Sequence, residues 1–286
     1  MESFKLAASC ALGICGVVSS TLLIRTLLGS KSLRKRDILR TIALTNIAEN
    51  IYCISYCIPI WAWLFCGHVF AEETTQIIAF INEVTYKAQI YQHTLLEVTR
   101  LYYTFRTRKK TPLASTITND IFLFLCWVIS VATIAVYFSY GRTVYYDYVY
   151  LEWLGENKWN TPIRIFYVCQ WVALYAGLGS AIAVLIAFWK KMPNTKNMKK
   201  TIEGKIFLQT IFLSLLDGLQ IMISVISANG LKSGIANILA LTRCSMSAPF
   251  YIFLNREIRT MICSSTSTVN TSQGRQSTAV FFLQTN

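Results

Sequence analysis

The stretch at residues 75–105, TQIIAFINEVTYKAQIYQHTLLEVTRLYYTF, decides the fold. As a helix it is long enough to cross a bilayer, which needs roughly 20 residues. Yet it carries ionisable side chains, which are costly at membrane depth and normally face a bundle interior or a wet cavity. At about 100° per residue, four polar side chains fall within an arc of roughly 80°. They are Glu83, Lys87, Thr94 and Glu97, and they predict a helix at the centre of a membrane bundle.

The composition is that of an integral membrane protein. Hydrophobic residues make up 54% of the 286 residues and charged residues 14%, whereas about a quarter of a typical soluble domain is charged. The net charge of +13 could indicate nucleic-acid binding, but the cations stand in short clusters between apolar segments rather than on one soluble surface. We therefore expect one all-α domain in a lipid bilayer, without a nucleic-acid partner.

Seven apolar segments are predicted to be transmembrane helices. They cover residues 6–28, 37–63, 75–105, 119–140, 162–189, 205–228 and 234–254. A short amphipathic surface helix is predicted over residues 255–263, because Ile258, Met261 and Ile262 share one face. The expected domain is thus a seven-helix bundle over residues 1–263. The Ser/Thr-rich tail at 264–286 is expected to be flexible and cytosolic.

Lys and Arg residues concentrate in alternate connecting segments. Those after the first, third and fifth apolar segments hold four, four and six of them, where the six include Lys205 at the start of the sixth segment. The other three hold none, then Arg142 and Lys158, then Lys232. Because cytoplasmic loops carry the excess of Lys and Arg, we expect the N-terminus outside the cell and the tail inside.

The connection at residues 141–160, GRTVYYDYVYLEWLGENKWN, is the longest between predicted spans. Tyr146, Tyr148 and Tyr150 alternate, which is the period-2 signal of a short hairpin. The same tyrosines could form an aromatic belt at the membrane interface. Both interpretations can hold together.

Polar residues inside other spans demand partners. Glu49 and Asn50 lie deep in the second span, Asp217 is the only deep aspartate, and Arg243 in the last span needs a counter-ion. Glu83, Glu49 or Asp217 could supply it. Glu49 and Asn50 predict either a mid-bundle ion or water site, or interhelical hydrogen bonds.

The upper third of the central helix is a candidate ligand site. Glu83 and Lys87 stand one turn apart with the acid first, the favourable order. They either anchor a polar ligand group or form an internal salt bridge that also serves Arg243. Arg243 is a further candidate ligand residue. An aromatic set could line the same cavity or simply pack between helices, and it consists of Tyr86, Tyr167, Trp171 and Tyr175.

No pattern for catalysis or metal binding stands out. The chain has two histidines, no CxxC spacing and no GxSxG motif, and Asp217 is the one aspartate deep in a span. An intramembrane enzyme would need a Ser–His pair, paired aspartates or a His/Asp metal set. We expect no enzymatic activity, no metal and no cofactor.

Four stretches carry a family resemblance. They are LRKRDILRTIALTNIAEN at 33–50, HTLLEVTRLYYTF at 93–105, KIFLQTIFLSLLDGLQ at 205–220 and APFYIFLNREIR at 248–259. In their order and spacing they resemble the rhodopsin-like G-protein-coupled receptors, and more closely the nematode serpentine chemoreceptors of the SRX class. The resemblance implies a seven-helix receptor that takes an extracellular small-molecule or peptide ligand and recruits a heterotrimeric G protein.

The resemblance also implies a switch at the end of the third span. The Arg100 guanidinium would bond a carboxylate at rest and be freed toward the G protein on activation. Glu97, three residues earlier, is the nearest acid. Ala248-Pro249-Phe250-Tyr251 resembles Asn-Pro-x-x-Tyr, which adds Pro249 and Tyr251 to the switch. The simpler interpretation of Arg100 is an interfacial cation that anchors the helix end.

Two expectations concern the membrane, and one alternative concerns function. Cys263 follows the short helix next to the membrane and is a palmitoylation candidate. The protein is expected to cross the plasma membrane several times, including that of sensory cilia.

The alternative to a receptor is a transporter or ligand-gated channel. A transporter built from repeats should show corresponding segments in its two halves, and none is found.

Overall fold

The structure is a computed structural model of the chain. It describes residues 2–30, 37–67, 70–105, 114–139, 144–147, 152–155, 161–191 and 233–267, together with 212–213, 215–216, 218–219 and 222. The predicted span at 205–228, which includes Asp217, therefore lies largely outside the described residues. So do the tail after residue 267 and most of the basic loops.

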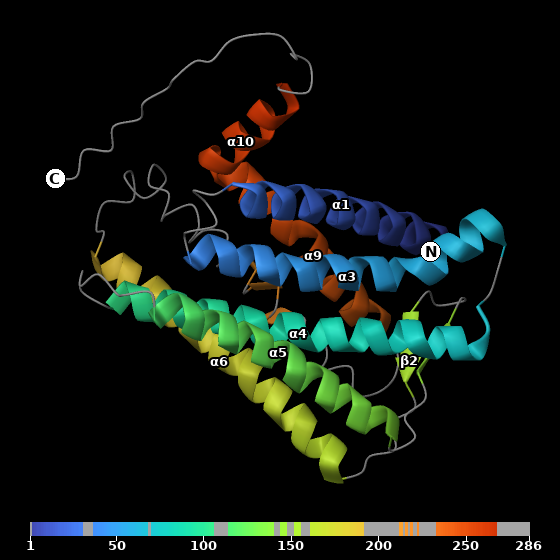
Figure 1. The fold of residues 1–286 in the computed structure, drawn as a ribbon. Coiled ribbons are helices and arrows are strands. Elements are labelled where there is room, and N and C mark those ends of the chain that lie inside the picture. The colour runs from blue at the N-terminus through green and yellow to red at the C-terminus, as the bar shows by residue number, and fades with distance from the viewer. Residues whose placement is uncertain are drawn as a thin grey trace.

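Six long helices and one shorter helix form the described part of the chain (Figure 1). Their bounds agree with six of the predicted spans to within a few residues at most ends. The helices are α1 (Glu2–Gly29), α3 (Asp37–Cys66), α4 (Glu72–Phe105), α5 (Ala114–Ser139), α6 (Thr161–Lys191), α9 (Ser233–Leu254) and α10 (Arg256–Ser267).

Successive long helices run in opposite directions, as Figure 1 shows for α1, α3 and α4. Helix α4 is central, since it packs against α3, α5 and α6. Helix α1 packs against both α3 and α9. Helix α3 ends at Gly67, whose φ of 62° is left-handed and whose N–H bonds the carbonyl of Trp63 at 3.1 Å. Glycine adopts this conformation without strain, which makes it a common helix terminator.

The connection after α5 contains an antiparallel hairpin. Strand β1 (Val144–Asp147) pairs with β2 (Glu152–Gly155), with Val144 opposite Gly155. Strand β1 contacts α4 and β2 contacts α9, so the hairpin lies at the end of the bundle where α4 begins (Figure 1). Tyr146 is buried there. This tyrosine thus packs into the helices instead of facing a membrane interface.

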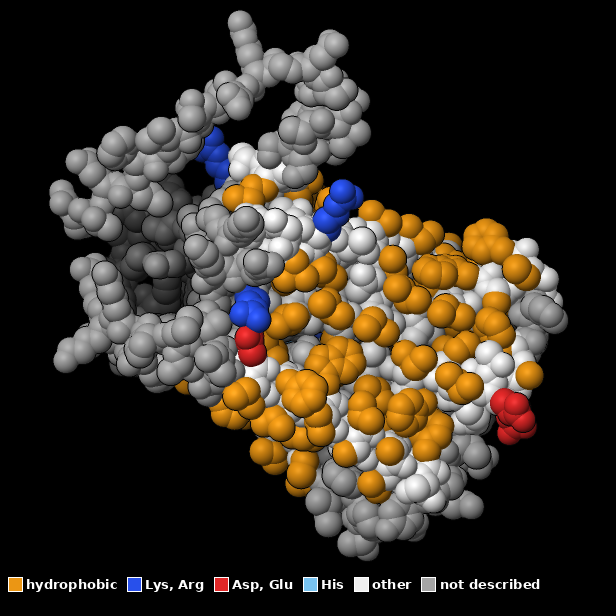
Figure 2. Space-filling view, in the orientation of Figure 1, with side chains coloured by type: hydrophobic (Ala, Val, Ile, Leu, Met, Phe, Trp, Pro, Cys, Tyr) orange, Lys and Arg blue, Asp and Glu red, His pale blue; other side chains and the backbone are white. Residues whose placement is uncertain are grey.

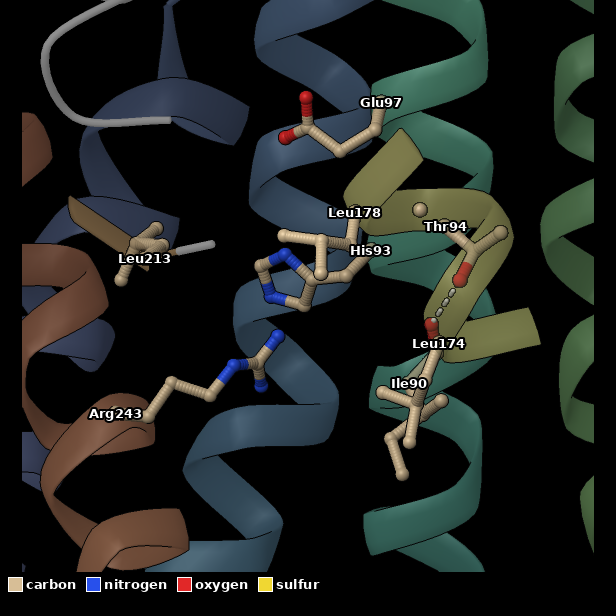
Figure 3. Close-up of a pocket in the computed structure, with 9 residues that line it drawn as sticks. Ile90, His93, Thr94, Glu97, Leu174, Leu178, Leu213 and Arg243 are labelled. Atoms are coloured by element: carbon tan, nitrogen blue, oxygen red, sulfur yellow. Dashed lines mark hydrogen bonds between the residues drawn. The ribbon is translucent and has the colours of Figure 1, made fainter. Parts of the chain in front are cut away.

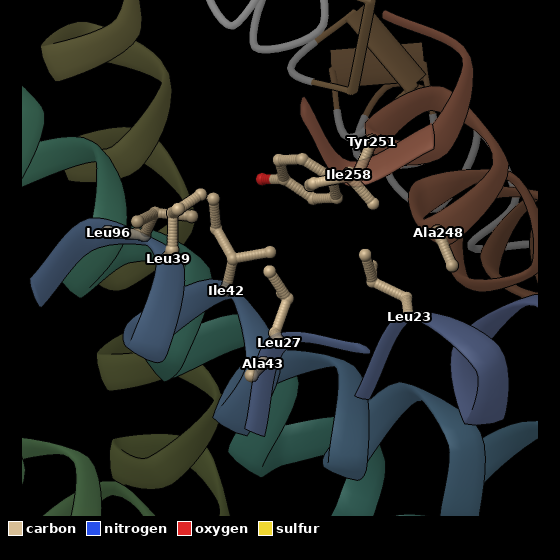
Figure 4. Packing of buried hydrophobic residues seen from close by; sticks show 9 residues of the cluster. All are labelled: Leu23, Leu27, Leu39, Ile42, Ala43, Leu96, Ala248, Tyr251 and Ile258. Carbon is tan, nitrogen blue, oxygen red and sulfur yellow. The ribbon is translucent and has the colours of Figure 1, made fainter. Parts of the chain in front are cut away.

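Of the three apolar clusters formed by the described residues, two lie along α1, α3 and α9, and the third joins α4 to α5. The α10-end cluster joins α1, α3, α4, α9 and α10, and Figure 4 shows its side chains converging. It consists of Leu23, Leu27, Leu39, Ile42, Ala43, Leu96, Ala248, Tyr251 and Ile258. The hairpin-end cluster consists of Tyr52, Cys53, Tyr56, Cys57, Ile60, Tyr146, Ala240, Leu241 and Cys244. The residues between the two clusters on α3, α4 and α9 form the candidate site.

The outer surface is that of a membrane protein. Helix α5 alone exposes Ile121, Phe122, Phe124, Leu125, Val128 and Ile129. Figure 2 shows hydrophobic side chains across this face, and the Lys and Arg side chains it colours among the described residues lie toward the end where α10 lies. Within the described residues, two helical segments are long and apolar enough to span a bilayer: Leu6–Gly29 and Asn119–Ser139. Other helices carry buried polar residues that lower their hydropathy.

Candidate functional site

A buried charged group joins three helices midway between the two apolar clusters. His93 Nε2 of α4 lies 2.7 Å from Glu49 Oε1 of α3, and Arg243 Nη1 of α9 lies 3.7 Å from the same oxygen. The side chain of Glu49 is 0% exposed. We name Glu49, His93 and Arg243 the Glu49 centre. It supplies the polar partner that Glu49 needs. Of the predicted counter-ions of Arg243, Glu49 lies within 4 Å of it, whereas Asp217 lies outside the described residues.

The three side chains of the Glu49 centre have complementary polar atoms. An ionised carboxylate only accepts hydrogen bonds, and an imidazole N–H and a guanidinium donate them. Both contacts fall on Oε1, while the buried Oε2 accepts no hydrogen bond from any described residue. Breaking a buried ion pair by removing one partner typically costs about 3–5 kcal/mol. The centre therefore holds α3, α4 and α9 together while one acceptor position stays unused.

Two further polar contacts line the same side of α4. The thiol of Cys244 on α9 donates to Gln89 Oε1 at 2.8 Å, and Asn82 Nδ2 donates to Ser55 Oγ on α3 at 3.0 Å. Residues 82, 89 and 93 lie on one helical face at about 100° per residue. This face meets α3 and α9.

The polar stripe predicted from the sequence lies about 90° further around α4. The ammonium of Lys87, which is 3% exposed, lies 5.8 Å from the centre of the Tyr137 ring on α5. Thr94 Oγ1 donates to the carbonyl of Ala173 on α6 at 2.9 Å. Helix α4 thus has two polar faces, and both are covered by other helices, as expected for a central helix in a membrane.

A small cavity adjoins the Glu49 centre (Figure 3). The figure shows the imidazole of His93 and the guanidinium of Arg243 pointing toward one another, with Glu97 one turn beyond. The cavity volume is about 20 Å³, room for about one water molecule, whereas pockets for drug-sized ligands are about 300–1,000 Å³. It is lined by Ile90, His93, Thr94, Glu97, Leu174, Gly177, Leu178, Leu213 and Arg243.

The predicted ligand residues do not line one common cavity in the part of the chain that the structure describes. Tyr86 packs against Tyr52 of α3 with ring centres 5.7 Å apart, while Lys87 faces α5. Trp171 stacks on Tyr175 within α6 at 6.0 Å, and the side chain of Tyr167 lies outside the described residues. Glu83 is half-buried. The ligand role of these residues remains a prediction.

The predicted switch residues lie at the α10 end. Glu97 is buried beside the cavity, and Tyr251 is buried in the α10-end cluster one turn from the cluster's Ala248. Pro249 lies inside α9. Arg100 lies in α4, but its side chain is outside the described residues.

Two further predicted residues lie elsewhere in the bundle. Cys263, the lipidation candidate, is exposed on α10. Asn50 donates a hydrogen bond to Thr21 of α1 at 3.0 Å, and such an interhelical bond was one of its two predicted roles.

His93 is the functional candidate that sequence reasoning missed. It appears in the sequence as one of several ionisable groups on the central helix, outside the arc of the predicted stripe. The signal that could have found it is the second face, Asn82, Gln89 and His93, which repeats at spacings of seven and four. One polar stripe is sufficient to indicate a central helix, so the second face adds nothing to that prediction and locates only the partner of Glu49.

The architecture defines the class of fold: a rhodopsin-like bundle of membrane helices. The chain is similar to the crystal structure of squid rhodopsin, with a TM-score of 0.71 and 12% sequence identity, over 96% of this chain and 89% of that one. No protein-family model matches the chain, and no curated protein matches it in sequence. At this identity the likeness shows the fold.

Proposed function

We propose that this membrane protein is a chemosensory G-protein-coupled receptor, similar to the nematode SRX class. The observation that carries the proposal is the Glu49 centre within a rhodopsin-like fold. A charged contact between α3, α4 and α9, with apolar clusters on both sides, suits an element that has two arrangements. The N-terminus and the hairpin face the outside in this proposal, and α10 faces the cytosol.

In the resting state, the Glu49 centre holds α9 against α3 and α4. A ligand that enters from the hairpin side contacts Glu83, Tyr86 and Lys87, and its differential affinity for the two arrangements shifts the population. Both contacts of Glu49 fall on Oε1, so Oε2 can accept a hydrogen bond from a group that moves away from Oε1. This supports such a rearrangement. The shift frees Arg100 from its acid at the cytosolic end, where the G protein binds.

A ligand screen in a heterologous cell, with cAMP or calcium as the readout, tests the proposal. The wild-type receptor should respond to at least one compound class, and Arg100→Ala should reach the surface equally but lose the response. Equal signalling from Arg100→Ala removes this residue from the mechanism. A ligand-evoked current that persists without G protein would instead identify a channel.

A second pair of variants tests the ligand site. Glu83→Gln and Lys87→Met should each lose the ligand response while surface expression is kept, because both remove a charge that would orient the ligand. If each variant instead fails to reach the surface, the two residues have a structural role.

A further inference from the structure

His93 uses only one of its two ring nitrogens in the Glu49 centre. Nε2 lies 2.7 Å from Glu49 Oε1, and Nδ1 makes no hydrogen bond with any residue that the structure describes. The residue is 7% exposed, and a buried polar atom without a partner typically costs about 1–3 kcal/mol. Because His93 lines the cavity beside the centre, a molecule inside that cavity can satisfy the second nitrogen.

Three further polar side chains line the same cavity. Glu97 follows His93 by four residues, a spacing that makes side chains neighbours on a helix, and Figure 3 shows it one turn beyond the imidazole. Thr94 Oγ1 donates to the carbonyl of Ala173, and its oxygen can also accept a hydrogen bond. Arg243 brings guanidinium donors from α9. The cavity therefore has donors as well as acceptors in its wall.

The size of the cavity limits what it can hold. Its volume is about 20 Å³, and one water molecule needs about 10–15 Å³ and two to four polar partners. Leu174 and Leu178 of α6, together with Leu213, close the side opposite α4 with apolar atoms. Gly177 lies between these two α6 leucines, and a Cβ atom there would lie 3.2 Å from Thr94 Oγ1. The absence of a side chain at residue 177 therefore keeps the cavity open on the α6 side.

The charges of the lining residues favour a neutral occupant. A cation in this space would lie next to the guanidinium of Arg243, and an anion would lie next to the carboxylate of Glu97. Water carries no net charge and both donates and accepts hydrogen bonds. It can therefore satisfy Nδ1 of His93 whether or not that nitrogen carries a proton.

We propose that this cavity binds one water molecule, which joins Nδ1 of His93 to the carboxylate of Glu97. Two hydrogen bonds of about 2.8 Å each let one water bridge atoms that are about 5–6 Å apart. The bridge extends the Glu49 centre by one turn of α4 toward the α10 end. Its role in signalling rests on the proposed function, in which Glu97 is the acid that holds Arg100. The water site itself does not depend on that function.

Hydroxyl-radical labelling of the purified full chain, read by mass spectrometry, tests the site because it marks side chains that lie next to water. Leu213 and Leu27 form a matched pair, since they are 4% and 1% exposed and only Leu213 lines the cavity. In the wild type, Leu213 should be labelled clearly more than Leu27. Equal labelling of the two leucines would overturn the proposal.

Gly177→Ala fills part of the cavity and should lower the labelling of Leu213 to the level of Leu27. Gly179→Ala is the matched control on the same helix, because a Cβ atom there would meet nothing within 4 Å, and it should keep the wild-type labelling. An equal fall in the control, or unchanged labelling in Gly177→Ala, would contradict the site.

His93→Gln tests the polar contact and decides alone if Gly177→Ala does not fold. The amide of glutamine can still donate to Glu49 but places no atom at Nδ1, so the labelling of Leu213 should fall. Unchanged labelling would show that His93 does not hold the water.

The signalling role is measured separately, as the ligand response at equal surface expression. Gly177→Ala should shift the concentration dependence of the response, and Gly179→Ala should not. A wild type that shows the labelling without any ligand response would keep the water site and remove the proposed function. A response without labelling of Leu213 would do the reverse.

Discussion

The α10-end cluster and the Glu49 centre connect the same helices by different physical means. The cluster joins α3, α4 and α9 through Ile42, Leu96 and Ala248, all closely packed and buried. The Glu49 centre joins the same three helices about one to two turns away through one carboxylate oxygen. Apolar packing has no direction and tolerates small shifts, whereas a buried charge is stabilised only while its partners stay within reach.

The difference assigns different tasks to the two regions. The cluster holds the helices together in any arrangement that keeps its side chains in contact. The Glu49 centre makes one arrangement more stable than others, because moving Arg243 or His93 away leaves a buried charge uncompensated. An effector that changes the contacts of Glu49 would therefore change which arrangement is populated, and the cluster would remain the pivot.

Arg243→Met tests this comparison with the largest expected effect. The variant leaves Glu49 with only His93, and we expect a loss of about 3–5 kcal/mol, as for other buried ion pairs that lose one partner. The measurement is thermal unfolding of the purified protein in detergent. The double variant Glu49→Gln/Arg243→Met removes both charges and should recover part of the loss. If the double variant is as unstable as the sum of the two singles, the two residues do not form an energetic pair.

Leu27→Ala probes the apolar side of the comparison. Leu27 is 1% exposed in the α10-end cluster, and truncation in a packed core costs about 2–5 kcal/mol. Leu27→Met keeps the volume and should cost less than about 1.5 kcal/mol. Since neither change alters a charge, the ligand response of the proposed receptor should keep its concentration dependence. A shifted response curve at equal surface expression would show that the cluster participates in the proposed switching.

Gly16→Ala has the smallest expected effect of the three and tests the contact of α1 with α3 and α9, the helices that both regions share. A Cβ atom at Gly16 would lie 2.9 Å from Cys53 Sγ and 3.0 Å from the backbone of Ser245. We expect a net loss of stability, because overpacking costs about 1–3 kcal/mol and the gain in helix propensity is about 1 kcal/mol.

Gly29→Ala is its control in the same helix, since a Cβ there would meet nothing within 4 Å. The control should keep or raise the unfolding temperature, because only the propensity gain remains. Equal unfolding temperatures for the two variants would mean that α1 can move away from α3 and α9 without loss.

Sequence reasoning located the helices but could not assign the partners of their polar residues. The low content of charged residues and the long apolar segments predicted a bundle of membrane helices. The ionisable groups at 75–105 indicated that one helix is buried at its centre. The same stripe argument placed Lys87 toward the interior but did not distinguish α5 from α9. It also overlooked His93, because a residue's neighbour across a helix interface depends on rotation and register, not on spacing along one chain.

The sequence by itself determined that this chain forms a bundle of membrane helices with α4 inside it. The physical reason is the lipid bilayer, because ionisable side chains are tolerated at membrane depth only where other helices cover them. The tertiary structure alone decided that Glu49 receives both His93 and Arg243, and that α10 places its apolar face on the bundle. These outcomes depend on how three or more helices are turned toward one another, which is settled only when their side chains pack.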